Sequence, residues 1–169
     1  MSAYRGKGNG VKAVAVAALL AVLVGCVPPL YEFGWALEFD IPDLGVRTVQ
    51  DAVAWTARNV HYAWDDGEYW QHPGQTYDRR AGDCEDYTIL AMYLVYRDVG
   101  VEPVMMTGRH NSGSFGHAWM RVDGIDYSPQ IGGPAPYLSI YYSERRRAIP
   151  YGEAIWRATM THRSVLADG

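Results

Sequence analysis

The spacing of apolar residues predicts two helices in the first two thirds of the chain. After Thr48-Val49-Gln50-Asp51, which has the spacing of a capping box, apolar residues recur at helical intervals and predict an amphipathic helix over Val49–His61. The segment Cys84–Arg97 is apolar on nearly every side and is followed by Gly100. A helix of that composition is expected to be buried, and the glycine is expected to end it.

The second half of the chain predicts a small sheet. Three segments have the composition of strands: Val101–Thr107, His117–Val122 and Ile125–Ser128. Asp123-Gly124 favours a tight hairpin turn between the last two. Loops are expected over Asp65–Arg80 and Gly108–Gly116, a further strand over the aromatic run Tyr137–Tyr142, and a closing helix over Tyr151–His162. Helices followed by an antiparallel sheet indicate an α+β fold.

The amino terminus has the pattern of an export signal. Three cations and no acid precede an unbroken apolar run at positions 13–24, which is shorter than the ~20 residues that span a bilayer. Leu23-Val24-Gly25-Cys26 resembles a bacterial lipobox, in which the cysteine is lipidated and becomes the new amino terminus. A retained transmembrane helix is the alternative. We therefore expect a signal peptide over 1–25, lipidated Cys26 and a tether over 26–45, and one domain over 46–169.

Charge and export set the expected location and partners. The chain has 15 basic and 19 acidic residues, and its formal net charge is −4. Such an acidic chain is a poor candidate for binding nucleic acid. The protein is expected to be anchored by its lipid to a bacterial membrane, facing the periplasm or the cell surface. The run Arg145-Arg146-Arg147 is expected to be a solvated basic turn, or a contact for anionic lipid headgroups. The oligomeric state stays open.

Cys84 is the candidate nucleophile. The chain has two cysteines, and the predicted lipidation of Cys26 leaves Cys84 without a disulfide partner. The first turn of a helix is expected to lower the pKa of a thiol and can hold an oxyanion. An imidazole from His117 within reach would complete a thiolate–imidazolium pair for acyl transfer. The acidic neighbours of Cys84 oppose thiolate formation, and a buried, inert cysteine is the alternative.

Several motifs together resemble a known family. Gly82-Asp83-Cys84-Glu85-Asp86-Tyr87, the helix that follows it, the next strand and His117-Ala118-Trp119 resemble the transglutaminase-like core shared by bacterial cysteine proteinases and true transglutaminases. The resemblance covers about Tyr62–Gln130. It implies a papain-like fold in which a buried helix carrying the cysteine packs on a small antiparallel sheet carrying the histidine. It also implies that Cys84 is the nucleophile and that His117 is the general base and then the general acid.

The third catalytic residue is where the sequence departs from that family, which places an aspartate on the strand after the histidine. A two-residue turn sets Arg121 opposite Asp126, so Asp126 would lie about 13 Å along the strand from His117 and would form a surface contact with Arg121. Gln130 falls opposite His117 in this register and could accept a hydrogen bond from the ring. Ser128 is the reserve candidate if the strand carries a bulge.

No cofactor is required by this chemistry, although calcium is possible. In periplasmic members of the family, the residues that correspond to Asp83, Glu85 and Asp86 can hold calcium, which prefers oxygen ligands. The competing interpretation is that Asp83 caps the helix and the other two acids complement its dipole, because one short segment supplies few ligands. Zinc is disfavoured, since Cys84, His110 and His117 lack paired ligand spacing.

The sequence leaves three functions open. The leading hypothesis is hydrolysis of a peptide or protein amide through a Cys84 thioester, ahead of crosslinking, because water is the default acceptor. The missing aspartate keeps open a weak or inactive relative that binds peptide or glycan in the cell envelope, for which 13 tyrosines and 6 tryptophans offer aromatic surface. A calcium-responsive adaptor is the third.

Trp70, Gln71 and Gln75 are candidates for a second oxyanion donor, and Trp119 is expected in the core.

Overall fold

The computed structural model describes residues 37–65, 69–113 and 115–167, so the predicted signal peptide and Cys26 lie outside the described residues. In chain order the elements are α2 (Val49–Asn59), β1 (His61–Tyr62), α3 (Pro73–Arg79), β2 (Ala81–Gly82), α4 (Cys84–Leu94), the π-helix η2 (Val95–Val99), β3 (Val104–Arg109), β4 (Gly116–Val122), β5 (Ile125–Ser128), β6 (Gly133–Pro134), α5 (Leu138–Tyr141), β7 (Glu144–Pro150) and α6 (Tyr151–Ala167). In the described ranges, no helix has the length and apolar character needed to cross a membrane.

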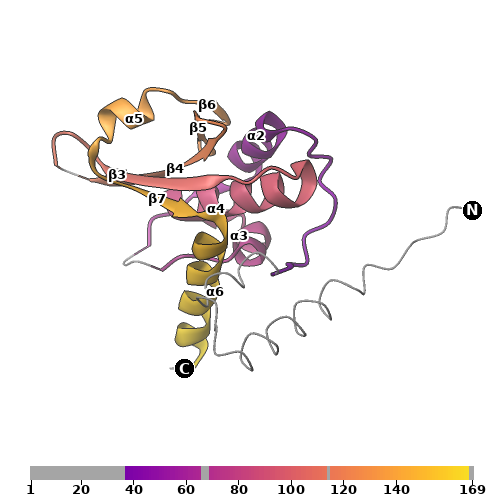
Figure 1. Ribbon diagram of the computed structural model, residues 1–169. Coiled ribbons are helices and arrows are strands. Elements are labelled where there is room, and N and C mark those ends of the chain that lie inside the picture. Colours follow the sequence, from indigo (N-terminus) through magenta and orange to yellow (C-terminus); the bar gives the residue numbers. More distant parts are fainter. Residues whose placement is uncertain (1–36, 66–68, 114, 168–169) are drawn as a thin grey trace, which may run out of the picture.

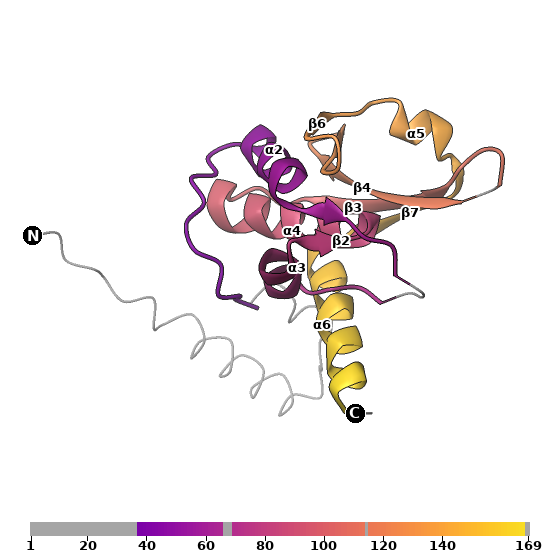
Figure 2. The ribbon, with the colours of Figure 1, turned by 180° about the vertical axis from the view of Figure 1, so that it is seen from behind.

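A five-stranded antiparallel sheet forms the centre of the fold, with strand order β6-β5-β4-β3-β7. The buried helix α4 packs on one face of this sheet and has α2, α3 and α6 as neighbours, whereas α5 lies over the other face (Figure 1). Figure 2 shows the separate parallel pair β1–β2 beside α4. The predicted α+β class is confirmed, with a cysteine-bearing helix packed on a sheet that carries His117.

The core forms where α4 meets β4. Ile89, Leu90 and Met92 of α4 are completely buried. They share a cluster with the side chains of alternate β4 residues, such as Met120. Removing each large apolar side chain of this kind from water is worth about 1.5–3 kcal/mol. Trp119 belongs to the opposite face, where it is buried as predicted in a smaller cluster. The α4 helix is therefore held firmly against the strand that bears the histidine.

The helix predictions are correct at the starts and differ at the ends. The α2 helix begins with the predicted capping box between Thr48 and Asp51. The α4 helix begins at Cys84, and the chain continues beyond Leu94 as the π-helix η2. Gly100 ends that segment with a φ of 76°, a left-handed conformation that glycine adopts without strain.

The hairpin that follows His117 is also as predicted. β5 has the expected bounds, and Asp123 and Gly124 both have positive φ, which matches the tight turn that favours strand twist. Arg121 pairs with Asp126 in the predicted register. The ladder between β4 and β5 runs from the pair Val122–Ile125 to the pair Met120–Tyr127.

Three elements differ from the sequence predictions. The run Tyr137–Tyr142 was expected to be a strand and instead contains the short helix α5. Arg145-Arg146-Arg147 lies in strand β7 rather than in a turn. The expected loop Asp65–Arg80 contains helix α3, in which Pro73 occupies the first turn and His72 caps the amino terminus. The conformation of each corrected element depends on packing partners elsewhere in the chain.

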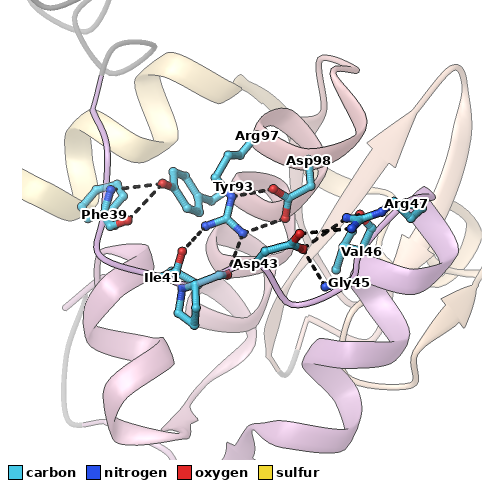
Figure 3. Close-up of polar contacts among 10 residues, drawn as sticks. Phe39, Ile41, Asp43, Gly45, Val46, Arg47, Tyr93, Arg97 and Asp98 are labelled. Atoms are coloured by element: carbon cyan, nitrogen blue, oxygen red, sulfur yellow. Dashed lines mark hydrogen bonds and ion pairs between the residues drawn. The ribbon is translucent and has the colours of Figure 1, made fainter. Parts of the chain in front are cut away.

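The described end of the predicted tether packs along the domain (Figure 3). The backbone N–H of Phe39 donates to the Tyr93 hydroxyl at 3.1 Å, and the Arg97 guanidinium donates to the Ile41 carbonyl at 2.6 Å. Arg97 is itself held by Asp98. Ile41 is buried in the main core. This segment thus contacts α4 through Tyr93 and η2 through Arg97.

Candidate active site

The first turn of α4 fixes the position of Cys84. Asp83 is the N-cap, and its carboxylate accepts hydrogen bonds from the backbone N–H groups of Glu85 and Asp86. Asp86 completes a capping box by accepting from the backbone N–H of Asp83 at 3.1 Å. The predicted capping role of Asp83 is confirmed. Gly82 precedes this turn, and a Cβ at that position would lie 2.5 Å from the Cβ of Asp86. The turn therefore requires glycine.

Asp86 is a buried structural carboxylate. Besides its capping bond, it accepts from the backbone N–H of Gln71 at 2.8 Å and from the Gln71 side-chain amide at 2.6 Å. Burial raises the pKa of Asp86 to about 7, although these donors favour the carboxylate. The network joins the segment before α3 to the start of α4. Gln71, a candidate second oxyanion donor, is consequently committed to Asp86 and to the Ala81 carbonyl.

The thiol of Cys84 is held in its neutral form. It is half-buried and donates to Oε2 of Glu85 at 2.8 Å. Burial, the Glu85 carboxylate and the Asp83 carboxylate raise the pKa of the thiol, while the backbone N–H of Ala118 lowers it. The expectation that the helix terminus lowers this pKa is therefore wrong for this arrangement. Desolvation and two nearby acids outweigh the partial charge of the helix.

His117 lies on β4 and is also neutral. Its ring packs near the rings of Tyr142, at a centroid separation of 4.9 Å, and Trp119, at 6.3 Å. Burial lowers the pKa of His117 to about 4. Among the described residues, no hydrogen bond to the ring is found. The imidazole is thus unprotonated at neutral pH, and no carboxylate of the described residues is bonded to it.

Cys84 begins α4 and His117 lies on β4, and these two elements pack against each other. The Cys84 sulfur lies beside the backbone N–H of Ala118, the residue next to His117. Glu85 and His117 line one cavity of about 380 Å³. Trp70 also lines this cavity, so of the three oxyanion candidates it is the one beside His117, while Gln75 accepts from the Tyr69 hydroxyl. The thiol proton, however, is directed to Glu85 rather than to the imidazole.

A second cavity of about 320 Å³ reaches His117 from another direction. Its remaining lining residues are His110, Phe115, Ser128, Gln130, Ile131, Tyr137, Leu138, Tyr141 and Tyr142. Gln130 and Ser128 therefore share a cavity with His117. Gln130 lies in the turn after β5, because the chain bends back at Ser128, whose carbonyl accepts from the N–H groups of Ile131 and Gly132. The amide of Gln130 makes no described hydrogen bond to the ring.

Asp126 belongs to a separate polar cluster. It forms an ion pair with Arg121 at 2.7 Å and accepts a hydrogen bond from the Ser139 hydroxyl. Its pKa is lowered because the hydrogen bonds from Arg121 and Ser139 outweigh the effect of burial. The indole N–H of Trp119 faces this carboxylate without hydrogen-bond geometry. The predicted pairing with Arg121 is confirmed, but Asp126 is buried and is not a surface contact.

The acids beside Cys84 give a limited set of metal ligands. Ligand atoms of Asp83, Cys84 and Glu85 lie within 4.8 Å of one another. Asp86, the third calcium candidate, is turned away toward Gln71. His110 lies outside this group, since its Nδ1 contacts the Ser112 hydroxyl and its ring stacks on Phe115. The described residues thus supply fewer acidic ligands than the sequence suggested.

The sequence reasoning missed two contributors to the site. Tyr142 reaches His117 from the segment before β7. Its backbone approaches Gly108 so closely that a Cβ there would lie 2.3 Å from the Tyr142 carbonyl oxygen. Arg147 lines the cavity that holds His117 and Glu85. The alternation of the arginine run would have indicated which members share a face, had the segment been read as a strand.

Comparisons with known proteins add little to this geometry. No model of a known protein family matches the sequence, and no curated protein matches it. The structure is similar to a crystal structure described as that of a putative cysteine protease from Cytophaga hutchinsonii, with 20% sequence identity and a TM-score of 0.40. The match covers 63% of this chain and 39% of that protein. The fold class therefore rests on the packing described above.

Proposed function

We propose that the protein is a cysteine acyltransferase of the transglutaminase-like type that hydrolyses a peptide or protein amide through a Cys84 thioester. The observation that supports this proposal is the placement of the Cys84 sulfur beside the backbone N–H of Ala118, the residue after His117 on β4, while Glu85, the residue after Cys84, shares a cavity with His117. Cavities on two sides of His117 leave room for a chain to extend past the reacting group. Nucleophilic catalysis requires a thiol without a disulfide partner close to an imidazole that can accept its proton.

The neutral resting state sets the order of proton transfers. The Cys84 sulfur attacks the substrate carbonyl, forming an S–C bond, while the thiol proton passes to the His117 ring. The ring then gives this proton to the leaving amine as the C–N bond breaks, which leaves a thioester. Water attacks the thioester with His117 as base, and the acid product and the thiol are released. The thiol must first rotate from Glu85 toward His117.

The first turn of α4 supplies the candidate oxyanion donor. Asp83 already accepts from the N–H groups of Glu85 and Asp86, so the backbone N–H of Cys84 is the first-turn amide that Asp83 leaves available. An N–H group at a helix terminus stabilises negative charge on a tetrahedral intermediate. Trp70 lines the neighbouring cavity and is the candidate for a second donor through its indole N–H.

Trapping of the thioester tests the proposal. The protein is incubated with p-nitrophenyl esters of short acylated peptides, and intact mass is recorded after acid quenching. We expect one acyl group on Cys84 that neutral hydroxylamine removes, and none on a Cys84→Ser variant of equal thermal stability. Labelling of Cys84→Ser to the same extent, or no adduct in the unmodified protein with any ester tested, would contradict the proposal.

A second candidate function is a binding module for peptide or glycan in the cell envelope. The aromatic cavity beside His117 favours it. Because a raised thiol pKa is expected for both functions, thioester trapping together with ligand binding separates them. Saturable binding of peptidoglycan fragments or peptides with no thioester would support the binding module.

We also propose export and lipid attachment at Cys26, supported by the Leu23-Val24-Gly25-Cys26 pattern. Metabolic labelling with a fatty acid tests this, with Cys26→Ser as the variant that should lose the label. Calcium binding at Asp83 and Glu85 is a further possibility that follows from their proximity. A melting temperature that calcium leaves unchanged, at a concentration far above any relevant dissociation constant, would remove it.

A further inference from the structure

Arginines line the larger of the two cavities at His117, the one that Glu85 also lines. We call these arginines the arginine wall. Four arginines line the cavity: Arg109 from β3, Arg145 and Arg147 from β7, and Arg157 from α6. Glu85 is the one acidic residue among the described residues that line this cavity. In a chain with a net charge of −4, this is a local concentration of positive charge beside the proposed reaction centre. Such a cleft attracts anions and raises their local concentration.

Arg147 and Ile149 share a face by strand alternation, whereas the β3–β7 register shifts between Arg147 and Glu144, where Arg145 has a φ of 49°. Arg145, Arg147 and Ile149 are alternate residues of β7 and line the same cavity. Arg146 points to the other face, where its guanidinium reaches the carbonyl of Ser139 at 3.5 Å. Arg145 and Arg147 therefore line the cavity next to His117 and remain exposed to solvent, and Arg146 lies on the other face of the strand.

The described acids leave most of this charge uncompensated. Arg157 is paired with Glu153 and lies near the Trp70 ring. Glu144 is opposite Arg109 in the β3–β7 ladder but does not line the cavity. No ion pair is described for Arg145 or Arg147 within the part of the chain that the structure covers. Guanidinium groups bind carboxylates with two parallel hydrogen bonds, so a carboxylate is the ligand that suits this wall.

We infer that the substrate is an anionic peptide with carboxylates within a few residues of the reacting carbonyl, which the arginine wall binds. This inference rests on the proposed function and adds its substrate class. The wall and His117 share one cavity, and an extended chain advances about 3.3 Å per residue. A carboxylate one to three residues from the reacting bond can therefore reach the arginines while the carbonyl lies at Cys84. The aromatic cavity beyond His117 receives the less polar side of the chain.

Binding to a variant that cannot react tests the inference. Cys84→Ala is titrated with a fluorescein-labelled peptide containing three glutamates and, separately, with the same peptide containing three glutamines. We expect the glutamate peptide to bind at least tenfold more tightly at low salt, and added salt to reduce the difference. Arg147→Gln, added to this variant, should weaken binding of the glutamate peptide about tenfold and leave the glutamine peptide unchanged.

Arg146→Gln is the matched control, because it removes the same charge from the neighbouring position of the same strand on the opposite face. Equal affinities for the two peptides, or equal losses in Arg146→Gln and Arg147→Gln, would overturn the inference. Binding of phosphatidylglycerol vesicles that Arg147→Gln abolishes, without selectivity between the peptides, would assign the wall to lipid and also overturn it. Melting temperatures confirm that each variant is folded.

The two proposals fail separately. Selective binding of the glutamate peptide, together with no thioester on the unmodified protein, would reject acyl transfer and retain the anionic ligand. A Cys84 thioester that forms equally fast from glutamate and glutamine peptides would retain acyl transfer and reject the anionic substrate. The glutamate and glutamine peptides have the same length, so any difference between them reflects the charge of their side chains.

Discussion

The two sides of the candidate site, the helix that carries Cys84 and the strand that carries His117, are built differently. On the helix, Asp83, Glu85 and Asp86 accept hydrogen bonds from neighbouring groups, and Gln71 adds two donors to the network. On the strand, the His117 ring has aromatic neighbours and, among the described residues, no hydrogen-bond partner. The first side is rigid and acidic, whereas the second is apolar.

This difference explains why both groups are neutral at rest. Burial, followed by the nearby acids, raises the pKa of the thiol on the helix, and burial alone lowers the pKa of the imidazole on the strand. A preformed ion pair is therefore disfavoured, and proton transfer has to accompany attack on the substrate. The family that the sequence resembles has an aspartate on the strand after the histidine, and this chain lacks it at the corresponding position. That absence agrees with a neutral His117, because no group in the described structure stabilises an imidazolium.

The largest expected effect concerns packing on the helix side. Gly82→Ala would place a Cβ 2.5 Å from the Asp86 side chain, whose own atoms are buried and held by Gln71. We expect a loss of about 3 kcal/mol in the free energy of unfolding, from overpacking and broken hydrogen bonds. Chemical denaturation measures it. Gly116→Ala is the control on the strand side, because its Cβ would meet only the Gly108 carbonyl oxygen, at 3.8 Å, and a similar loss there would refute the contrast.

The two sides should also respond oppositely to acid. Glu85 has a folded pKa of about 7, above its ordinary 4.5, so the folded state gains stability as pH falls through this window. His117 has a folded pKa of about 4, below its ordinary 6.5, so stability is lost as pH falls from 6.5 toward 4. Relative to the unmodified protein, acidification from pH 8 to pH 5 should stabilise His117→Gln and destabilise Glu85→Gln, each by about 2 kcal/mol.

Urea denaturation at the two pH values measures these changes as differences from the unmodified protein, in which the raised pKa of Asp86 adds a further stabilising contribution on acidification. The same sign of shift in both variants would show that the contrast between helix and strand is wrong.

A smaller effect is expected on thiol reactivity. Glu85→Gln removes the anion that accepts the thiol hydrogen bond, so the pKa of Cys84 should fall. One pKa unit corresponds to about a tenfold rise in thiolate below the pKa, and the rate of iodoacetamide labelling at pH 7 should rise accordingly. Glu153→Gln, which removes an acid paired with Arg157, is the control and should leave the rate unchanged. An unchanged rate in Glu85→Gln would mean that the contact with the sulfur is not formed in solution.

The smallest effect concerns Gln130, which shares a cavity with His117 but makes no described bond to it. Gln130→Ala should reduce the acylation rate by less than tenfold, because a neutral amide orients a ring only weakly. Gln130→Asp should raise the pKa of His117 and shift the acid limb of the pH–rate profile upward. A loss of a hundredfold or more in Gln130→Ala would instead make this residue a full member of the site.

Local patterns predicted the parts of the site that depend on local structure. The capping sequence and the apolar run located α4 and placed Cys84 in its first turn. The two-residue turn fixed the register of β4 and β5, including the pairing of Arg121 with Asp126. In each case the residues that determine the conformation are within a few positions of one another, so sequence alone carries the signal.

The remaining features depend on distant partners. Strand β7 has exposed residues on both faces along most of its length and lacks apolar alternation, and its pairing with β3 fixes it as a strand. Helix α5 buries Leu138 through a contact with Trp119 and Met106. The raised thiol pKa follows from how deeply Cys84 and its acidic neighbours are buried, which residue spacing does not reveal. The sequence did not predict the arginine wall, because two of its arginines lie in β7 and that strand was not predicted.

The most direct test of a working Cys84–His117 pair is the single-turnover rate of Cys84 acylation as a function of pH, in the unmodified protein and in His117→Asn. We expect the rate to fall at least a hundredfold in the variant, which is the scale of general-base catalysis. The unmodified protein should lose activity as pH falls toward 4 and His117 gains its proton, with this inflection absent from the variant. Acylation of His117→Asn at the unmodified rate, with the same pH profile, would contradict the account.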